Sequence, residues 1–237
     1  GALGVFLGSV FLVIDLGRPD RFLNMLRVFR PTSAISVGSW LLAASGAANS
    51  GAAVFDRRVL GDIAGAAGGA LGLPLAGYTG VLLADTAVPL WNETRRSLPL
   101  LFVASAMSSA ADLLAFADLD NREHAVVHRF GLAGNVAELA AGYMVEKDAG
   151  RVERVARPLN EGVGGSLWKA SKLATIASLM LSVVVGRNRW GRWIAALLGT
   201  AGSLALRYAV FHAGKASSRD PRATFETQRQ NEPSVRG

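Results

Sequence analysis

The 237-residue chain is 51% hydrophobic and 18% charged, has a formal net charge of +7 and contains no cysteine. Without cysteine this chain can form no disulfide and no Cys-ligated iron–sulfur cluster or zinc site. The positive charge does not favour nucleic acid as a partner, because the arginines flank apolar runs and form no basic stripe.

The apolar residues lie in runs of roughly 20, which is the length that a helix needs to cross a bilayer. Backbone polar groups find no partner in lipid, so such runs must be helical. We therefore predict an all-α fold, a polytopic transmembrane helix bundle in the lipid bilayer. Seven segments are visible, and the first is partial because the chain starts inside it: 1–14, 34–54, 61–84, 98–117, 125–145, 167–186 and 193–212.

Residues 1–213 form the predicted bundle, and residues 214–237 form a predicted polar extramembrane tail. The tail is poor in apolar residues, so we expect it to be extended or disordered unless a partner orders it. The connector 146–166 is charged and is expected to form a small amphipathic surface helix.

Successive connectors alternate sides of the membrane and so define two faces. Face X carries the connectors 15–33, 85–97 and 146–166 and the tail, whereas face Y carries 55–60, 118–124 and 187–192. Lys and Arg are more numerous on face X, which the positive-inside rule places in the cytoplasm. A docking face for an acidic partner would produce the same bias, so the orientation stays open.

The stretch "FLVIDLGRPDRFLNMLRVFRPTS" ends the first apolar run in Asp15, and Arg18, Arg21, Arg27 and Arg30 follow. Asp15 either caps the helix and pairs with a nearby arginine or belongs to a functional site. The arginines anchor a helix end or form a docking face.

The third segment contains "GDIAGAAGGALG", in which glycines recur at four-residue spacing, as expected for closely packed membrane helices. Tyr78 lies near the end of the third segment at face X. It is either an aromatic residue of the membrane interface or part of a functional site. Glu138 lies inside the fifth segment, where a carboxylate needs a partner or a proton. Because the third and fifth segments both run toward face X, Asp15, Tyr78 and Glu138 would converge on one pocket near that face.

Asp112 lies near the face Y end of the fourth segment, opposite His128 and Arg129. It forms either a structural ion pair or a proton entry. A haem with two histidine ligands needs them on facing helices at one depth. His124 and His128 share one helix near face Y and His212 lies near face X, so no such haem is expected. An electron-transfer role for this chain would therefore require a bound organic cofactor.

The chain resembles membrane subunits of the NrfD/PsrC type, found with polysulfide, nitrite and related respiratory reductases. The resemblance rests on "DLGRPDRFLNMLRVFRPTSAISVGSW" at 15–40, "YTGVLLADTAVPLWNETRRSLPLLFVASA" at 78–106 and "AGKASSRDPRATFETQR" at 213–229. It implies eight helices in the full chain, one of them before Gly1, in the cytoplasmic membrane.

The resemblance also implies a function. Such subunits pass electrons between menaquinone or ubiquinone, which is bound as a substrate, and an iron–sulfur subunit docked on one face. Through that subunit they serve a catalytic subunit, for which molybdopterin is one expected cofactor. The terminal substrate, the quinone type and the direction of electron flow are not readable from this chain.

The resemblance carries Tyr78 over as a quinone-binding residue, and Asp15 and Arg18 match its signature. Glu138 joins these quinone-binding residues because of its position inside a span, and for the same reason Glu138, Asp112 and His128 form the expected proton relay. Next to an iron–sulfur subunit, Arg18, Arg21, Arg27 and Arg30 would form the docking rim. One alternative is a structural anchor without a working quinone site. Another is a proton or small-solute transporter that uses Glu138 and Asp112, which the missing internal repeat disfavours.

Overall fold

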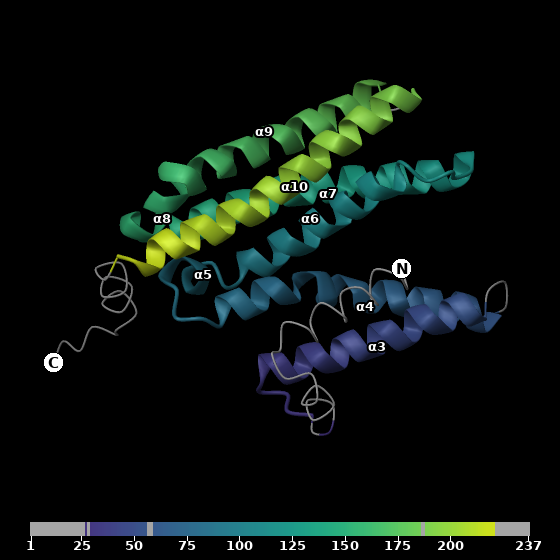
Figure 1. The fold of residues 1–237 in the computed structure, drawn as a ribbon, viewed down its shortest axis with the longest axis horizontal. Coiled ribbons are helices and arrows are strands. Elements are labelled where there is room, and N and C mark those ends of the chain that lie inside the picture. The colour runs from purple at the N-terminus through teal and green to yellow at the C-terminus, as the bar shows by residue number, and fades with distance from the viewer. Residues whose placement is uncertain (1–26, 28, 56–58, 186–187, 221–237) are drawn as a thin grey trace. The chain divides into compact units, whose positions relative to one another are not determined.

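The computed structural model describes residues 27, 29–55, 59–185 and 188–220, and the helices in this part confirm the expected all-α class (Figure 1). The contacts divide the chain into two compact units, Gly1–Leu82 and Leu83–Gly237. We call them unit 1 and unit 2 and describe each by itself. The predicted segment 1–14 lies outside the described residues.

Unit 1 contains an antiparallel pair of helices, α3 (Ala34–Val54) and most of α4 (Val59–Ala84). Glycines let the two backbones approach closely. A Cβ placed on Gly51 would lie 3.5 Å from the Ala64 Cβ, and one placed on Gly68 would lie 3.1 Å from Asn49 Nδ2. The predicted close packing is therefore present in part of the glycine-rich stretch, while Gly72 has no neighbour within 4 Å.

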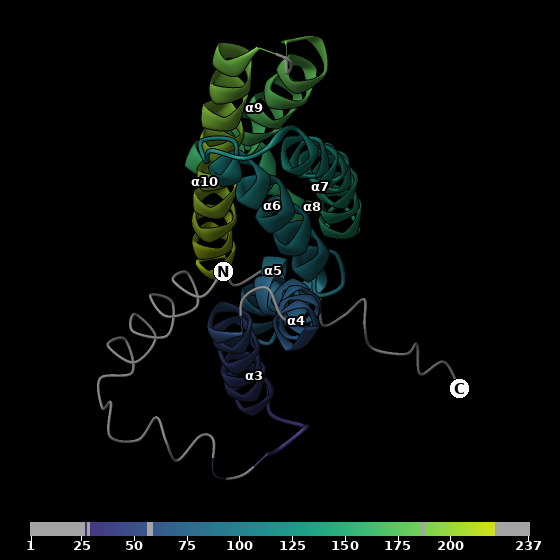
Figure 2. The ribbon, with the colours of Figure 1, turned by 90° about the vertical axis from the view of Figure 1, so that its right-hand side faces the viewer.

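Unit 2 is built on four long helices: α6 (Ser97–Leu114), α7 (Asn121–Ala149), α9 (Gly162–Val185) and α10 (Arg189–Ser218). Helix α6 pairs with α7, α9 pairs with α10, and α10 also packs on α6 (Figure 2). Two short helices, α5 (Pro89–Glu93) and α8 (Glu153–Asn160), pack where α7 and α10 end and α6 and α9 begin. We call this the X end of unit 2.

Side-chain hydrogen bonds cap the starts of two of these helices. Asp120 and Glu123 form a capping box at the start of α7, and the Asn188 side chain accepts from Trp190 N before α10. Helix α8 confirms the amphipathic helix expected in the connector 146–166, because its apolar residues Val155 and Leu159 are buried.

The X end of unit 2 holds the apolar core. Its largest members include Trp168, Leu98, Leu101 and Phe102, which come from α9 and α6. Toward the other end the buried residues become small or polar, with Ser105, Ser108, Asn135, Glu138 and Asp112 all less than 10% exposed. We call that other end, where α6 and α9 finish, the Y end.

Four of the described helices are long and apolar enough to span a membrane: Val59–Ala84, Ser97–Leu114, Gly162–Val184 and Arg189–Ser218. Helices α3 and α7, which cover the segments predicted at 34–54 and 125–145, are long enough but less apolar, because α3 is rich in Ser and Gly and α7 carries charged residues at both ends. The chain is thus a multi-pass membrane protein.

Helix α10 continues to Ser218, four residues past the predicted start of the tail at 214. A tertiary contact extends it, because the Ser217 hydroxyl accepts a hydrogen bond from Leu90 N at 3.2 Å. One turn earlier Trp91 lies directly against Gly214 and donates to the Val210 carbonyl at 3.1 Å. The remaining tail, 221–237, lies outside the described residues.

We predict that Gly214→Ala destabilises unit 2 by roughly 1–3 kcal/mol, because the added methyl group would overlap the Trp91 indole. Thermal unfolding of the detergent-solubilised protein measures the loss. Gly72→Ala is the matched control, since that helical glycine has no neighbour within 4 Å. It should be neutral or stabilising by up to about 1 kcal/mol. Equal effects of the two substitutions would contradict the packing at Trp91.

Candidate functional site

Glu138 is a carboxylate buried in the middle of unit 2, with 5% of its surface exposed. Its Oε2 accepts from Ser108 Oγ of α6 at 2.9 Å, and its Oε1 accepts from Thr175 Oγ1 of α9 at 2.9 Å. No cation of the described residues forms an ion pair with it. Hydroxyls from two neighbouring helices therefore take the place that water would have around this carboxylate.

The two hydroxyl partners determine what Glu138 can do chemically. A hydroxyl can either donate or accept, so it satisfies an ionised carboxylate and also a protonated one. A lysine or arginine partner would instead favour the ionised form. Glu138 can therefore gain or lose a proton without leaving a polar atom unpaired, which is the property that a proton-transferring group needs.

Asp112 borders a small cavity of about 50 Å³ at the Y end. The cavity is also lined by His124, His128, Asn135 and Arg192. Among the described residues, Asp112 Oδ2 and Arg192 Nε are buried without a hydrogen-bond partner. The cavity has room for a water molecule.

The ion pair that the sequence allowed between Asp112 and His128 or Arg129 is not formed within the described residues. The reason is the packing of α10 against α6. A Cβ on Gly199 would overlap the Asp112 carboxylate, so this glycine admits the carboxylate on the α10 side. Asp112 and His128 nevertheless line the same cavity, as a proton relay requires.

Asn135 connects the cavity and the buried carboxylate along α7. It lies three residues before Glu138, is 3% exposed and lines the cavity. Asp112 and Ser108 are likewise one turn apart on α6, and Ser108 bonds Glu138. Two adjacent helices therefore carry polar side chains from the Y-end cavity to Glu138.

Tyr78 lies in unit 1, where its hydroxyl donates to the Ala34 carbonyl at 2.9 Å. Its ring lies against Gly38, where a Cβ would overlap it. The oxygen of Tyr78 keeps its acceptor capacity, and the side chain is half-buried. Because Tyr78 and Glu138 belong to different units, their convergence on one pocket stays a prediction.

The other expected site residues lie near the start of the chain. Asp15, Arg18 and Arg21 fall outside the described residues. Arg27 and Arg30 are exposed, as a docking surface requires. Their role in docking stays a prediction.

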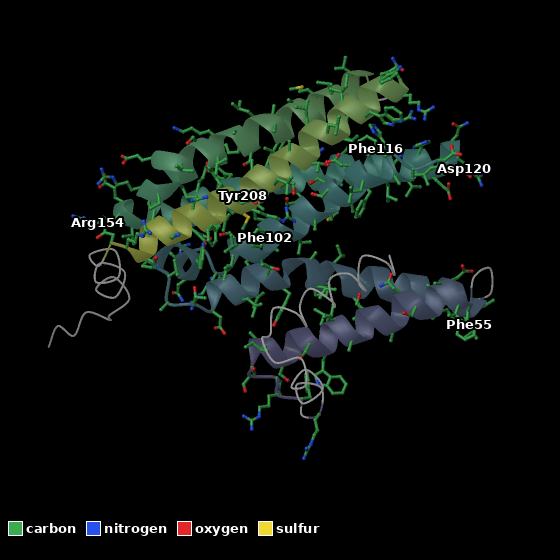
Figure 3. All side chains as sticks on the ribbon, in the orientation of Figure 1. Phe55, Phe102, Phe116, Asp120, Arg154 and Tyr208 are labelled. Carbon is green, nitrogen blue, oxygen red and sulfur yellow. The ribbon has the colours of Figure 1, made fainter. Side chains whose placement is uncertain are left out.

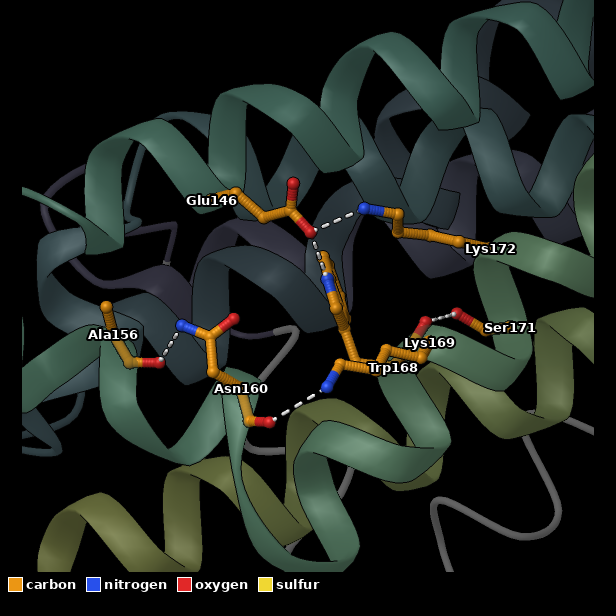
Figure 4. Close-up of polar contacts among 7 residues, drawn as sticks. All are labelled: Glu146, Ala156, Asn160, Trp168, Lys169, Ser171 and Lys172. Atoms are coloured by element: carbon orange, nitrogen blue, oxygen red, sulfur yellow. Dashed lines mark hydrogen bonds and ion pairs between the residues drawn. The ribbon is translucent and has the colours of Figure 1, made fainter.

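The sequence analysis missed a second polar cluster, at the X end (Figure 4). Glu146 Oε1 of α7 accepts from Trp168 Nε1 at 2.6 Å and from Lys172 Nζ at 2.8 Å, both on α9. Lys169 Nζ donates to the Asn160 carbonyl at 3.3 Å. The cluster borders a cavity of about 330 Å³ and ties α7, α8 and α9 together. The acidic residue at the end of the fifth segment was visible in the sequence. Its hydrogen-bond partners on α9 could not be predicted, because they depend on helix register.

The described residues contain no group of three His, Cys, Asp or Glu side chains that could hold a metal ion. The candidate site in unit 2 is the row of polar side chains that leads from Asp112 to Glu138. Tyr78 is the candidate residue of unit 1.

Comparison with known proteins gives one match. Residues 2–219 match the model of the family NrfD_2, described as polysulfide reductase. No curated protein and no solved structure matches the chain. The family match spans nearly the whole chain, including both units.

We predict that Thr175→Val, which keeps the side-chain shape, destabilises unit 2 by about 1–3 kcal/mol, because one buried carboxylate oxygen loses its donor. Thermal unfolding of the purified protein measures the change. Ser178→Ala is the control on the same helix, because the Ser178 hydroxyl is buried without a partner. It should be neutral or stabilising. If Thr175→Val were as stable as wild type, the hydroxyl contact to Glu138 would be contradicted.

Proposed function

This chain belongs to the polysulfide reductase family NrfD, and on that basis we propose that it passes electrons between the membrane quinone pool and an iron–sulfur subunit. It is a membrane subunit of polysulfide/nitrite reductase-like complexes. The observation that carries the proposal is Glu138, a carboxylate held by hydroxyls inside a membrane-spanning bundle. Ionisable groups at such positions are costly and mark functional sites.

A bound menaquinone or ubiquinone would supply the two-electron chemistry, and each electron is accompanied by a proton. Tyr78, Asp15, Arg18 and Glu138 are the proposed quinone-binding residues. The Tyr78 oxygen can accept a hydrogen bond from a quinol hydroxyl, and its hydroxyl can donate to a quinone carbonyl when it turns from the Ala34 carbonyl. Glu138 holds or releases the proton, since its two hydroxyl partners accommodate both protonation states.

The proposed proton relay runs from Glu138 toward the Y end. Asn135 and Ser108 lie between Glu138 and the cavity that Asp112 and His128 line. An imidazole carries one donor and one acceptor nitrogen, so it can take up a proton on one side and release one on the other. Support for this relay is that Asp112, His128 and Asn135 line one cavity and that Asp112 is buried beside it.

The proposed partner is an iron–sulfur subunit, and through it a catalytic subunit of the molybdopterin kind. Arg18, Arg21, Arg27 and Arg30 form the proposed docking rim. The X end of unit 2 adds a polar cavity of about 480 Å³. It is lined by Asn92, Glu93, Arg95, Arg96, Asp148 and Arg151. Its arginines complement an acidic protein surface.

We predict that Tyr78→Phe weakens binding of a quinol analogue by about 2- to 10-fold, the effect of losing one neutral hydrogen bond. Fluorescence quenching of the analogue by the full-length subunit measures the binding. Tyr143→Phe is the matched control, because Tyr143 is 68% exposed on α7. Absence of saturable binding by the folded wild-type protein would leave this chain as a structural anchor without a working quinone site.

We predict that Glu138→Gln lowers quinol-linked turnover of the assembled complex by at least about 100-fold, as loss of a general acid–base group does. The amide keeps the shape and both bonding positions, so assembly should persist. Turnover is measured with an artificial quinol, and assembly is measured by co-purification of the subunits. A Glu138→Gln complex with wild-type turnover would contradict the role of Glu138. Proton movement into vesicles without any quinol would instead favour the transporter alternative.

A further inference from the structure

Arg207 is a charged residue within the apolar part of α10. It is not among the proposed quinone-binding or proton-relay residues. It is the sole Lys, Arg, Asp or Glu between Arg192 and Lys215. Its side chain is exposed, although the helix is one of those long and apolar enough to span a membrane. A cation in that position is costly in lipid and needs a partner.

Serines from two helices hold one side of the guanidinium. Arg207 Nη1 donates to the Ser203 carbonyl at 3.2 Å and to Ser105 Oγ at 3.3 Å, and it also bonds Ser203 Oγ. The Ser105 and Ser203 hydroxyls are 2.9 Å apart, and Ser109 Oγ donates to Ser203 Oγ at 2.7 Å. The guanidinium also lies 6.0 Å from the centre of the Phe102 ring. We call Arg207 and these three serines the arginine–serine cluster.

The direction of the Arg207 side chain is opposite to that of an interfacial anchor. Arg207 lies 11 residues before the end of α10, so the X end is roughly 16 Å away along the helix axis. An arginine that serves as an anchor extends toward the nearer headgroups. Arg207 instead bonds Ser203, one turn toward the middle of the helix. The charge is therefore held inside the span.

Within the part of the chain that the structure describes, the guanidinium makes no hydrogen bond on the side away from the serines. All of its bonds to described residues come from Nη1. None of the described carboxylates forms an ion pair with Arg207, and Glu138 acts on it through space without contact. An arginine carries five N–H donors, so Nε and Nη2 can bind a further acceptor.

We propose that the arginine–serine cluster binds a carbonyl oxygen of a membrane quinone, at a position separate from Tyr78. This inference rests on the proposed function. A quinone is an apolar ring that enters lipid and carries carbonyl acceptors, which suits a donor held inside a span. Lipid phosphates lie at the membrane surfaces, beyond the reach of a side chain that bends toward the helix middle.

Exposed aromatic residues beside the cluster provide the apolar contacts that a quinone ring needs. Tyr208 of α10 lies in the stretch where this helix meets α6, while Phe102 of α6 is buried in the core there (Figure 3). Tyr208 is 60% exposed and Phe211 is 52% exposed. Binding sites for such ligands combine mostly apolar walls with a few oriented polar groups.

The test is a titration of the full-length subunit with 2-heptyl-4-hydroxyquinoline N-oxide, a fluorescent quinol analogue. Arg207→Gln should bind roughly 10- to 100-fold more weakly, as expected on losing a charge-assisted hydrogen bond, and Arg207→Lys should fall between it and wild type. Arg189→Gln is the matched control, because Arg189 opens the same helix and is exposed at its other end. It should bind as wild type does.

A second variant keeps the inference testable if Arg207→Gln does not fold. Ser203→Ala removes the hydroxyl that Arg207, Ser105 and Ser109 share, while the backbone carbonyl remains. It should weaken binding several-fold with little change in thermal unfolding. Unchanged affinity in Ser203→Ala and in any folded Arg207→Gln would overturn the inference.

Tyr78→Phe in the same titration separates this inference from the proposed function. Binding that Tyr78→Phe weakens and Arg207→Gln does not would overturn the inference and leave the proposed function intact. Wild-type protein without saturable binding would overturn both. If Arg207→Gln binds the analogue normally but fails to co-purify with another membrane chain, the guanidinium pairs with a carboxylate of that chain, and the inference is wrong.

Discussion

Lipid offers no hydrogen bonds, and this constraint decides how the polar side chains of unit 2 are arranged. A polar side chain inside the bundle is stabilised by a partner on its own helix or on a neighbouring one. Glu138 bonds Ser108 and Thr175 of two neighbouring helices, and Arg207 bonds Ser105 of α6 and Ser203 of its own helix. The partners are almost all hydroxyls, which respond to a change of protonation by turning from donor to acceptor. The bundle can thereby hold a buried carboxylate in either protonation state.

Small residues make these contacts geometrically accessible. A Cβ on Gly134 would lie 2.6 Å from the Ser108 backbone nitrogen, and one on Gly202 would lie 3.0 Å from the Ala174 Cβ. Close approach of the backbones brings short side chains such as serine within hydrogen-bonding distance across a helix pair. The glycines of α7 and α10 are thus part of the polar architecture, because bulkier residues there would separate the helices that share Glu138.

The all-α class and most helix positions could be predicted from the sequence, because an apolar run long enough to cross a membrane can pair its backbone polar groups only as a helix. It also identified Glu138, since a carboxylate inside a span is conspicuous. Its partners Ser108 and Thr175 were not predictable, because hydroxyls are common in apolar segments and their pairing depends on helix register. The extension of α10 to Ser218 was missed for a related reason, as it depends on a contact with Leu90. Arg207 was visible as a lone charge but was overlooked.

The bond from Leu90 to Ser217 joins residues 127 positions apart, and it bears on how the protein is made. Among the helices of unit 2, α10 leaves the ribosome last. Its residues Val210 and Ala213 complete the apolar core that Trp168 and Leu98 enter. Until α10 inserts, one side of that core is not covered by a helix. Biogenesis of unit 2 therefore ends in a single closing step, and a chain interrupted before α10 presents an unfinished apolar surface to chaperones and membrane proteases.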